Sequence, residues 1–205
     1  MAKRKTVAQA QPPAMTDYRD LLSGKRFDLI IADVPWSYAR DDGEKVEGLL
    51  GYPTFPVDAY AGMMSAFYQA LKPNRNMWCW CDYFTLPALL DAAKLVGFTY
   101  RALCVVKRYH LGLGHFNRKD CYFLPAWSKG SAYTNKAESG RFPEYLGEYR
   151  LVDGHKPQAV YERIIAHSLP KGGTWIDPFP NVHEGVIRAA DGTIRIQPPL
   201  WGEIA

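Results

Sequence analysis

Three residues that could do chemistry, Asp33, Pro35 and Trp36, directly follow a short apolar run in the sequence FDLIIADVPW of residues 27–36. A carboxylate beside a Pro-fixed turn and a flat aromatic ring can hold a planar amine, because the carboxylate accepts its proton and the ring stacks on it. This combination is typical of a site for an amino-purine or amino-pyrimidine. An ordinary turn followed by a core tryptophan has the same residues, so the motif alone leaves both interpretations open.

The element that positions Asp33 is the apolar run itself. Residues 27–32 are nearly all apolar, which predicts a strand covered on both faces. Open α/β sheets place their ligand crevice at the carboxyl ends of such strands. We therefore expect Asp33 to lie at the ligand-binding edge of a sheet.

Strands and helices are predicted to alternate along the rest of the chain. Helices are predicted over 57–71, 86–96, 155–167 and 182–190, and strands over 77–81, 100–107, 121–127 and 194–196. The last core strand and its turn are predicted over 174–180. Residues 37–56 are predicted to form a long loop, with a substrate lid as one interpretation, and residues 128–152 to be irregular. The alternation predicts an α/β fold with a mostly parallel sheet and helices on both faces.

Length and composition predict one domain over residues 15–205, preceded by a flexible basic tail over 1–14. The formal net charge of +4 permits nucleic-acid binding without requiring it. No apolar run approaches the roughly 20 residues that span a membrane, and no signal-peptide core follows the basic start. A cytoplasmic protein without membrane contact is expected.

The four cysteines, Cys79, Cys81, Cys104 and Cys121, show neither Cys-x-x-Cys nor zinc-finger spacing. Buried free thiols are therefore expected, and no metal site is predicted.

Seven segments carry a resemblance to a known family. They are 27–36, 52–54, the pair 77–80 and 86–98, 112–118, 127–130, 155–157 and 201–203. The first two resemble the strand with Asp-Pro-Pro-Trp and the Tyr-x-Thr that follows it in one family. The next three resemble that family's aromatic strand and helix, its glycine loop and its tryptophan-containing strand. The last two resemble its Lys-Pro helix start and its closing Trp-Gly-Asn-Glu. This family is the adenine-N6 methyltransferases typified by the eukaryotic mRNA adenosine enzyme, with bacterial and phage relatives.

The resemblance implies a Rossmann-like fold dependent on S-adenosylmethionine, with a permuted order in which the catalytic motif comes first and the cofactor strand last. It implies methyl transfer to the N6 amine of adenine in nucleic acid. The small size and the lack of a further recognition domain favour DNA over RNA. The chain departs from the family at Val34, where the family has Pro, and in having Asp120 but no Glu near Tyr122.

In the family's mechanism, the Asp33 carboxylate and the Val34 carbonyl accept the protons of the target amine, within the catalytic motif completed by Pro35 and Trp36. Trp36 or Tyr38 is expected to stack on the base. Further substrate-binding candidates are Tyr52 and Thr54.

Lys156 is the main cofactor candidate, since it resembles the family lysine that meets the methionine carboxylate and stands at a helix start. A solvated lysine at a helix end is the alternative. The remaining cofactor candidates are Asp17, Asp177, Phe179, Asn181 and Glu203. A helix cap for Asp17 and a turn for Asn181 are equally compatible with the sequence.

Arg108, Arg118 and Lys119 belong to a basic stretch around one loop. A solvated basic surface is the usual interpretation of such a stretch, but beside a base-binding cleft we expect phosphate contacts.

Two alternatives to a DNA adenine enzyme stay open. One is a catalytically degenerate member of the same family that binds nucleic acid as a partner subunit. The other is an amino-methyltransferase that acts on RNA adenine or on cytosine. The sequence predicts no oligomeric state.

Overall fold

The computed structural model describes residues 18–36, 55–109, 118–136, 142–149, 156–179 and 186–188. Its strands are β1 (Phe27–Ala32), β2 (Leu71–Cys79), β3 (Thr99–Arg108), β4 (Cys121–Lys129), β5 (Tyr145–Tyr149), β6 (Thr174–Ile176) and β7 (Val186–Arg188). Its helices are α1 (Tyr18–Leu22), the 3-10 helix η1 (Val57–Ala59), α3 (Tyr60–Ala70), α4 (Leu86–Leu95) and α5 (Gln158–Ser168). The predicted tail over 1–14 and the strand over 194–196 lie outside this part of the chain.

The strands form one sheet in the order β5-β3-β4-β2-β1-β6-β7. Strand β1 runs parallel to its neighbours β2 and β6, and β3 runs parallel to β5. Strand β4 is antiparallel to both β2 and β3, and β7 is antiparallel to β6. Five strands thus share one direction, which confirms the mostly parallel sheet, while the reversed β4 in its middle was not predicted.

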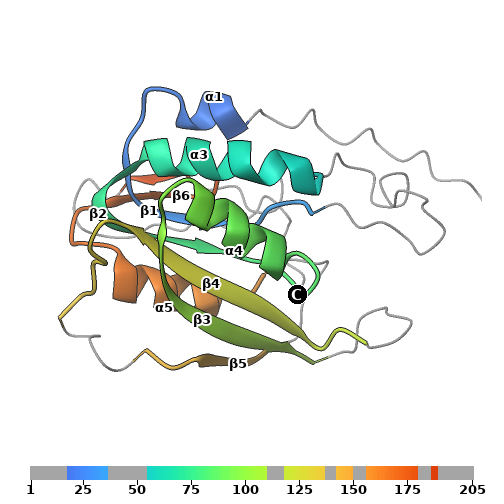
Figure 1. Cartoon of the computed structure of the whole chain (residues 1–205). Coiled ribbons are helices and arrows are strands. Elements are labelled where there is room, and N and C mark those ends of the chain that lie inside the picture. Colours follow the sequence, from blue (N-terminus) through green and yellow to red (C-terminus); the bar gives the residue numbers. More distant parts are fainter. Residues whose placement is uncertain are drawn as a thin grey trace, which may run out of the picture.

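Helices cover both faces of the sheet, as predicted. Helices α1, α3 and α4 lie on one face and α5 lies on the other (Figure 1). The six residues of β1 are all buried and divide between two cores. Ile30 faces the α3 side with Phe67, whereas Leu29 and Ile31 face the α5 side with Ile164. This alternation follows from the two-residue period of a strand, and it makes β1 the centre of the molecule.

Strand β2 begins earlier than predicted. Helix α3 passes directly into it, because Leu71 already has an extended conformation. The register with β1 then jumps from Leu71 opposite Phe27 to Asn76 opposite Leu29. The extra residues form a bulge that contains the left-handed Asn74. The polar stretch before residue 77 obscured this strand because it lies in a bulge and not in a regular ladder.

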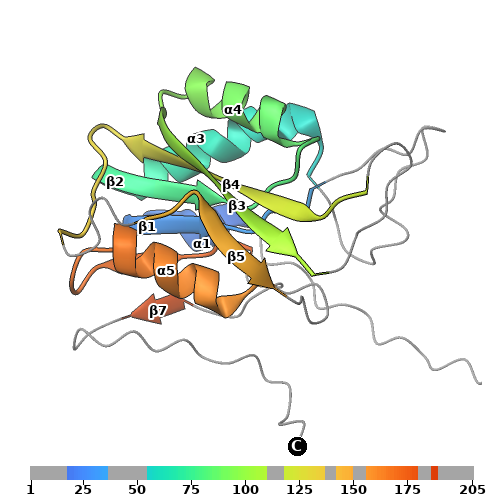
Figure 2. The same ribbon diagram turned by 90° about the horizontal axis from the view of Figure 1, so that it is seen from below.

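Two edge strands correct the sequence-based predictions. Strand β5 lies within the segment 128–152 that was predicted to be irregular, and it pairs with β3 (Figure 2). Strand β7 lies within 182–190, where a helix was predicted, and it pairs with β6. Both have only five residues or fewer, too few for a periodic pattern. Backbone pairing with a longer or more buried strand defines them.

The start of helix α5 also differs slightly from the prediction. The helix begins at Gln158, and Pro157 is an extended residue just before it. This conformation is the one that a proline and the residue before it favour. Lys156 therefore lies on an extended approach to the helix and not within its first turn.

Candidate active site

The candidate site lies where β1, β2 and β6 end side by side. Ile30 of β1 lies opposite Ile176 of β6, so the residues that follow the two parallel strands emerge together. Asp33 follows β1 and Asp177 follows β6, and the backbone N–H of Asp33 donates to Asp177 Oδ1 at 3.4 Å. Two carboxyl groups thus lie next to each other at the edge where α/β sheets bind ligands.

Asp33 forms an ion pair with Lys156. The lysine Nζ lies 2.9 Å from Asp33 Oδ1 and 3.0 Å from Oδ2, and Asp33 is buried while Lys156 is partly buried. The two residues are 123 positions apart, and the placement of α5 before β6 brings them together. The sequence predicted both as site residues but in separate roles, so their direct pairing is a finding of the structure.

Trp36 holds the turn after β1 in place. Its indole Nε1–H donates to the carbonyl of Trp80 at 2.8 Å, and its ring packs edge-on against Tyr60. Pro35 accepts a hydrogen bond from the backbone N–H of Phe55, and Val34 is buried. With only 6% of its surface exposed, Trp36 anchors the turn. The expected stacking of Trp36 on a base does not fit this buried position.

Asp177 is buried behind Asp33 and organises the turn after β6. Its Oδ1 accepts the N–H of Phe179 at 3.0 Å, and its Oδ2 accepts the hydroxyl of Tyr161 at 3.2 Å. Burial, and then the negative charge of Asp33, raise the pKa of Asp177 to about 8. Asp177 therefore favours its neutral form near pH 7 and acts on the protein's own backbone.

Tyr161 and Tyr122 are site residues that sequence reasoning missed. Tyr161 lies on the buried face of α5, where its apolar neighbours made it indistinguishable from a core residue. The Tyr122 ring lies 4.6 Å from Lys156 Nζ and 5.3 Å from the guanidinium carbon of Arg108. Arg108 was predicted to hold phosphate, and the structure places it against the same tyrosine ring as the lysine of the ion pair. Two cations thus flank one aromatic ring at the site.

The other two predicted phosphate contacts lie near the end of β2. Lys119 forms an ion pair with Asp82, which is fully buried. Its charge is therefore compensated within the protein, which weakens its expected role on phosphate. Arg118 is exposed at the rim of the same region.

Six other predicted residues lie outside the part of the chain that the structure describes. They are the substrate-binding candidates Tyr38, Tyr52 and Thr54 and the cofactor-binding candidates Asp17, Asn181 and Glu203.

The structure also describes the four cysteines and the lengths of the helices. Cys79, Cys81 and Cys104 are buried thiols, while Cys121 is half-buried. Among the described residues, no helix is both long and apolar enough to cross a membrane, and no three metal-binding side chains gather into a site.

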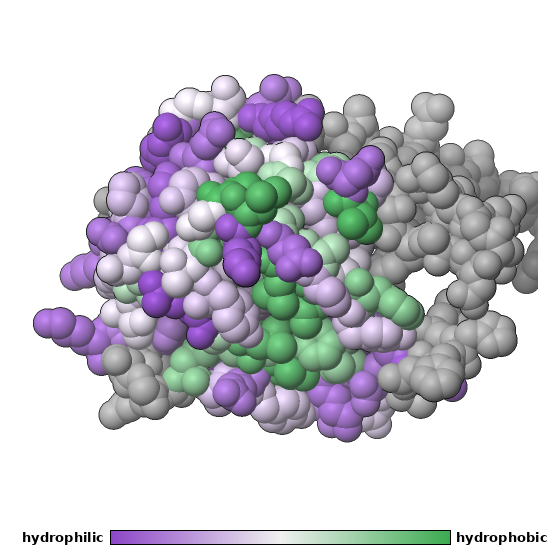
Figure 3. Space-filling view, in the orientation of Figure 1, coloured by the Kyte–Doolittle hydropathy of each residue, from purple (hydrophilic) through white to green (hydrophobic). Residues whose placement is uncertain are grey.

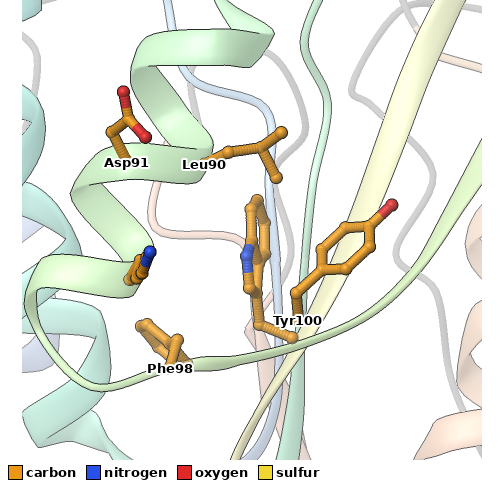
Figure 4. A pocket seen from close by; sticks show the side chains of 6 residues that line it. Leu90, Asp91, Phe98 and Tyr100 are labelled. Atoms are coloured by element: carbon orange, nitrogen blue, oxygen red, sulfur yellow. The ribbon is translucent and has the colours of Figure 1, made fainter.

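A separate cavity of about 350 Å³ opens between α4 and the start of β3. Leu90, Asp91, Phe98 and Tyr100 line it (Figure 4), together with Lys94 and Trp127. It belongs to a face on which apolar side chains form a band framed by hydrophilic ones (Figure 3). Tyr100 is the second residue of β3, so this cavity lies toward the end of the sheet opposite to Asp33.

Solved structures share this fold. No protein-family model matches the sequence, and no curated protein matches it. The complex of M1.HpyAVI with S-adenosylmethionine superposes with a TM-score of 0.59, covering 80% of this chain and 79% of that chain at 16% identity. TTHA0409 of Thermus thermophilus, provisionally described as a DNA modification methylase and also complexed with S-adenosylmethionine, gives 0.55 over 80% and 77% at 14% identity. The likeness confirms the predicted Rossmann-like methyltransferase fold.

Proposed function

We propose that this protein transfers the methyl group of S-adenosylmethionine to the N6 amine of adenine in DNA. The observation that carries the proposal is the Asp33–Lys156 pair at the carboxyl edge of β1, directly followed by the fixed turn of Val34, Pro35 and Trp36. The fold, which it shares with two structures that hold S-adenosylmethionine, supports the cofactor. A DNA modification methylase among them supports DNA as the substrate.

The chemistry requires two acceptors for the protons of one amine. The lone pair of the adenine amine is delocalised into the ring, so the nitrogen becomes nucleophilic only when its protons are drawn into hydrogen bonds. The Asp33 carboxylate and the Val34 carbonyl are consecutive acceptors on one rigid turn. Since a carbonyl is present whatever the side chain, Val34 replaces the family's Pro without loss of this acceptor.

The site also fits the cofactor. S-adenosylmethionine supplies an electrophilic methyl group on a sulfonium, together with a carboxylate that needs a cation. Lys156 is the cation best placed for that carboxylate, and the Arg108 guanidinium contacts the same Tyr122 ring. Asp177 contributes by holding the backbone of Phe179 and Asp33 in place. Asp17, Asn181 and Glu203 stay proposed contacts to the cofactor.

Lys156 has a second role in this proposal, because it pairs with the residue that must accept the amine. The ion pair fixes the position of the Asp33 carboxyl group, whose oxygens are the proposed acceptors of the amine. DNA is then held by Arg108 and Arg118, with Tyr38, Tyr52 and Thr54 as further candidates around the base.

The test is mass spectrometry of nucleosides from DNA incubated with the purified protein and S-adenosylmethionine. We expect N6-methyladenine, and about 100- to 1000-fold less of it with an Asp33→Asn variant that still binds S-adenosylhomocysteine. Methyl transfer to cytosine or only to RNA would replace the proposed substrate. Absence of S-adenosylhomocysteine binding in the wild type would instead support a nucleic-acid-binding subunit without activity.

A further inference from the structure

Two aromatic rings are stacked on each other in the turn after β2. The ring centroids of Tyr83 and Phe84 lie 4.0 Å apart with their planes 34° apart. Phe84 is 62% exposed, although a phenylalanine normally gains free energy by burial. What distinguishes Phe84 from other exposed apolar residues is the second ring beside it, because the pair offers flat aromatic surface to a ligand.

The turn beneath the rings is rigid. Asp82 Oδ1 accepts the backbone N–H of Phe84 at 3.0 Å and that of Thr85 at 3.1 Å. Asp82 is itself buried and forms the ion pair with Lys119. The exposed position of Phe84 is therefore imposed by a network of hydrogen bonds at the start of α4. A ring fixed in this way loses little conformational entropy when it binds a partner.

The turn lies beside the candidate active site. Trp80, three residues before Tyr83, donates its backbone N–H to Ala32 and accepts the indole N–H of Trp36. The turn after β2 and the turn after β1 thus leave neighbouring strands at the same edge of the sheet. The two rings therefore lie at the edge of the sheet that carries Asp33, and they are not part of the Asp33–Lys156 pair.

A cation accompanies the two rings. Lys119 Nζ lies 5.1 Å from the centroid of Phe84 and 5.9 Å from that of Tyr83. Exposed Arg118 precedes it in the chain. Flat aromatic surface is where a nucleotide base can stack, and the exposed Arg118 adds positive charge next to it, whereas the charge of Lys119 is compensated by Asp82. This combination favours a nucleotide over an apolar protein segment.

We infer that Tyr83 and Phe84 form a stacking platform for an unpaired base of DNA that neighbours the target adenine. The inference rests on the proposed function for the nature of the substrate and adds a site that the reaction itself does not use. Enzymes that modify a base take it out of the helical stack, which leaves its neighbours without a stacking partner. A platform next to the site would replace that lost stacking and favour the open strand.

The test measures binding of a fluorescein-labelled single-stranded DNA with one adenine by fluorescence anisotropy, without cofactor. Phe84→Ala should weaken binding roughly 5- to 150-fold, the range for loss of one stacked base. Phe84→Trp should keep the affinity. Leu95→Ala is the matched control, because Leu95 is an equally exposed apolar residue on α4 and should have no effect.

Abasic substitutions in the DNA identify the partner base. One position beside the adenine should weaken wild-type binding when its base is removed, and the same removal should have no further effect with Phe84→Ala. The slope of log affinity against log salt should not change, since no phosphate contact is lost.

Three outcomes overturn the inference. They are an unchanged affinity of the folded Phe84→Ala variant, a loss that is independent of every abasic position, and a change of oligomeric state in place of DNA affinity. Failure of the proposed function looks different, because the wild type would then bind no DNA or leave it unmethylated.

Discussion

Strand β1 places one buried aspartate near its start and another just after its end, and the protein treats the two differently. Asp28 accepts hydrogen bonds from Lys72 at 2.7 Å, Arg75 at 3.0 Å and the backbone N–H of Thr174 at 3.1 Å. Asp33 pairs with one lysine and lies against a second carboxyl group, that of Asp177.

The pKa values of the carboxyl groups at the two ends of β1 shift in opposite directions. Burial disfavours the charged form of Asp28, but hydrogen bonds from Lys72, Thr174 and Arg75 outweigh it and lower its pKa. At the other end, burial and the charge of Asp33 raise the pKa of Asp177 to about 8. At the start of β1 three hydrogen-bond donors surround the single carboxyl group of Asp28, whereas just after β1 two carboxyl groups, Asp33 and Asp177, lie next to each other. A carboxylate fully occupied by the protein stabilises the fold, whereas one at a crowded edge can serve a substrate.

The sharpest test of this contrast is Asp33→Asn, which keeps the shape of the side chain and removes its charge. We expect methyl transfer to fall about 100- to 1000-fold, or about 2.7–4 kcal/mol, as for loss of one charge-stabilising group in a transition state. The assay is the rate of N6-methyladenine formation at saturating cofactor. Wild-type turnover would remove Asp33 from the mechanism.

Asp28→Asn should have the opposite effect, with loss of stability and retention of activity per folded molecule. We expect the free energy of unfolding in urea to fall by about 1–3 kcal/mol, toward the lower end because Lys72 is 40% exposed. Because the pKa of Asp28 is lowered, its stabilisation is present above pH of about 4, near the ordinary value of 3.8, and is lost as the pH falls further. A large loss of methyl transfer without loss of stability would mean that Asp28 acts in the reaction and not in the stability of the fold.

Part of this arrangement could be predicted from the sequence. The apolar run over residues 27–32 predicted β1, and its end placed Asp33 at the ligand edge, because both follow from local patterns. The Asp33–Lys156 pair could not be predicted in the same way, since it depends on β6 lying beside β1 and on α5 preceding β6. Two partners of Asp28, Lys72 and Arg75, come from a bulge in β2 that has no periodic signal.

Asp177→Asn tests, through the pH dependence of stability, the end of β1 where Asp33 and Asp177 lie together. In the folded protein the Asp177 carboxyl keeps its proton up to a pH of about 8, whereas the unfolded chain releases it near 3.8. The folded state therefore binds one more proton over this range, and stability falls as the pH rises, by at most about 1.4 kcal/mol per pH unit. The variant should lack this decline. Melting temperatures of both proteins between pH 5 and pH 8 provide the comparison, and parallel curves would mean that Asp177 is ionised throughout.

Lys156→Met gives the smallest expected effect and separates the two roles of this lysine. Methionine keeps much of the buried stem but removes the charge, so any ligand carboxylate loses its cation. S-adenosylmethionine and S-adenosylhomocysteine carry the same carboxylate, and the affinity for both should fall equally, by about tenfold or about 1.4 kcal/mol. Isothermal titration calorimetry measures both. Lys72→Met is the control, because Lys72 compensates Asp28 at the opposite end of β1 and should leave both affinities unchanged. If Lys156→Met also leaves them unchanged while slowing methyl transfer, then Lys156 acts on Asp33 alone, and the cofactor carboxylate binds elsewhere.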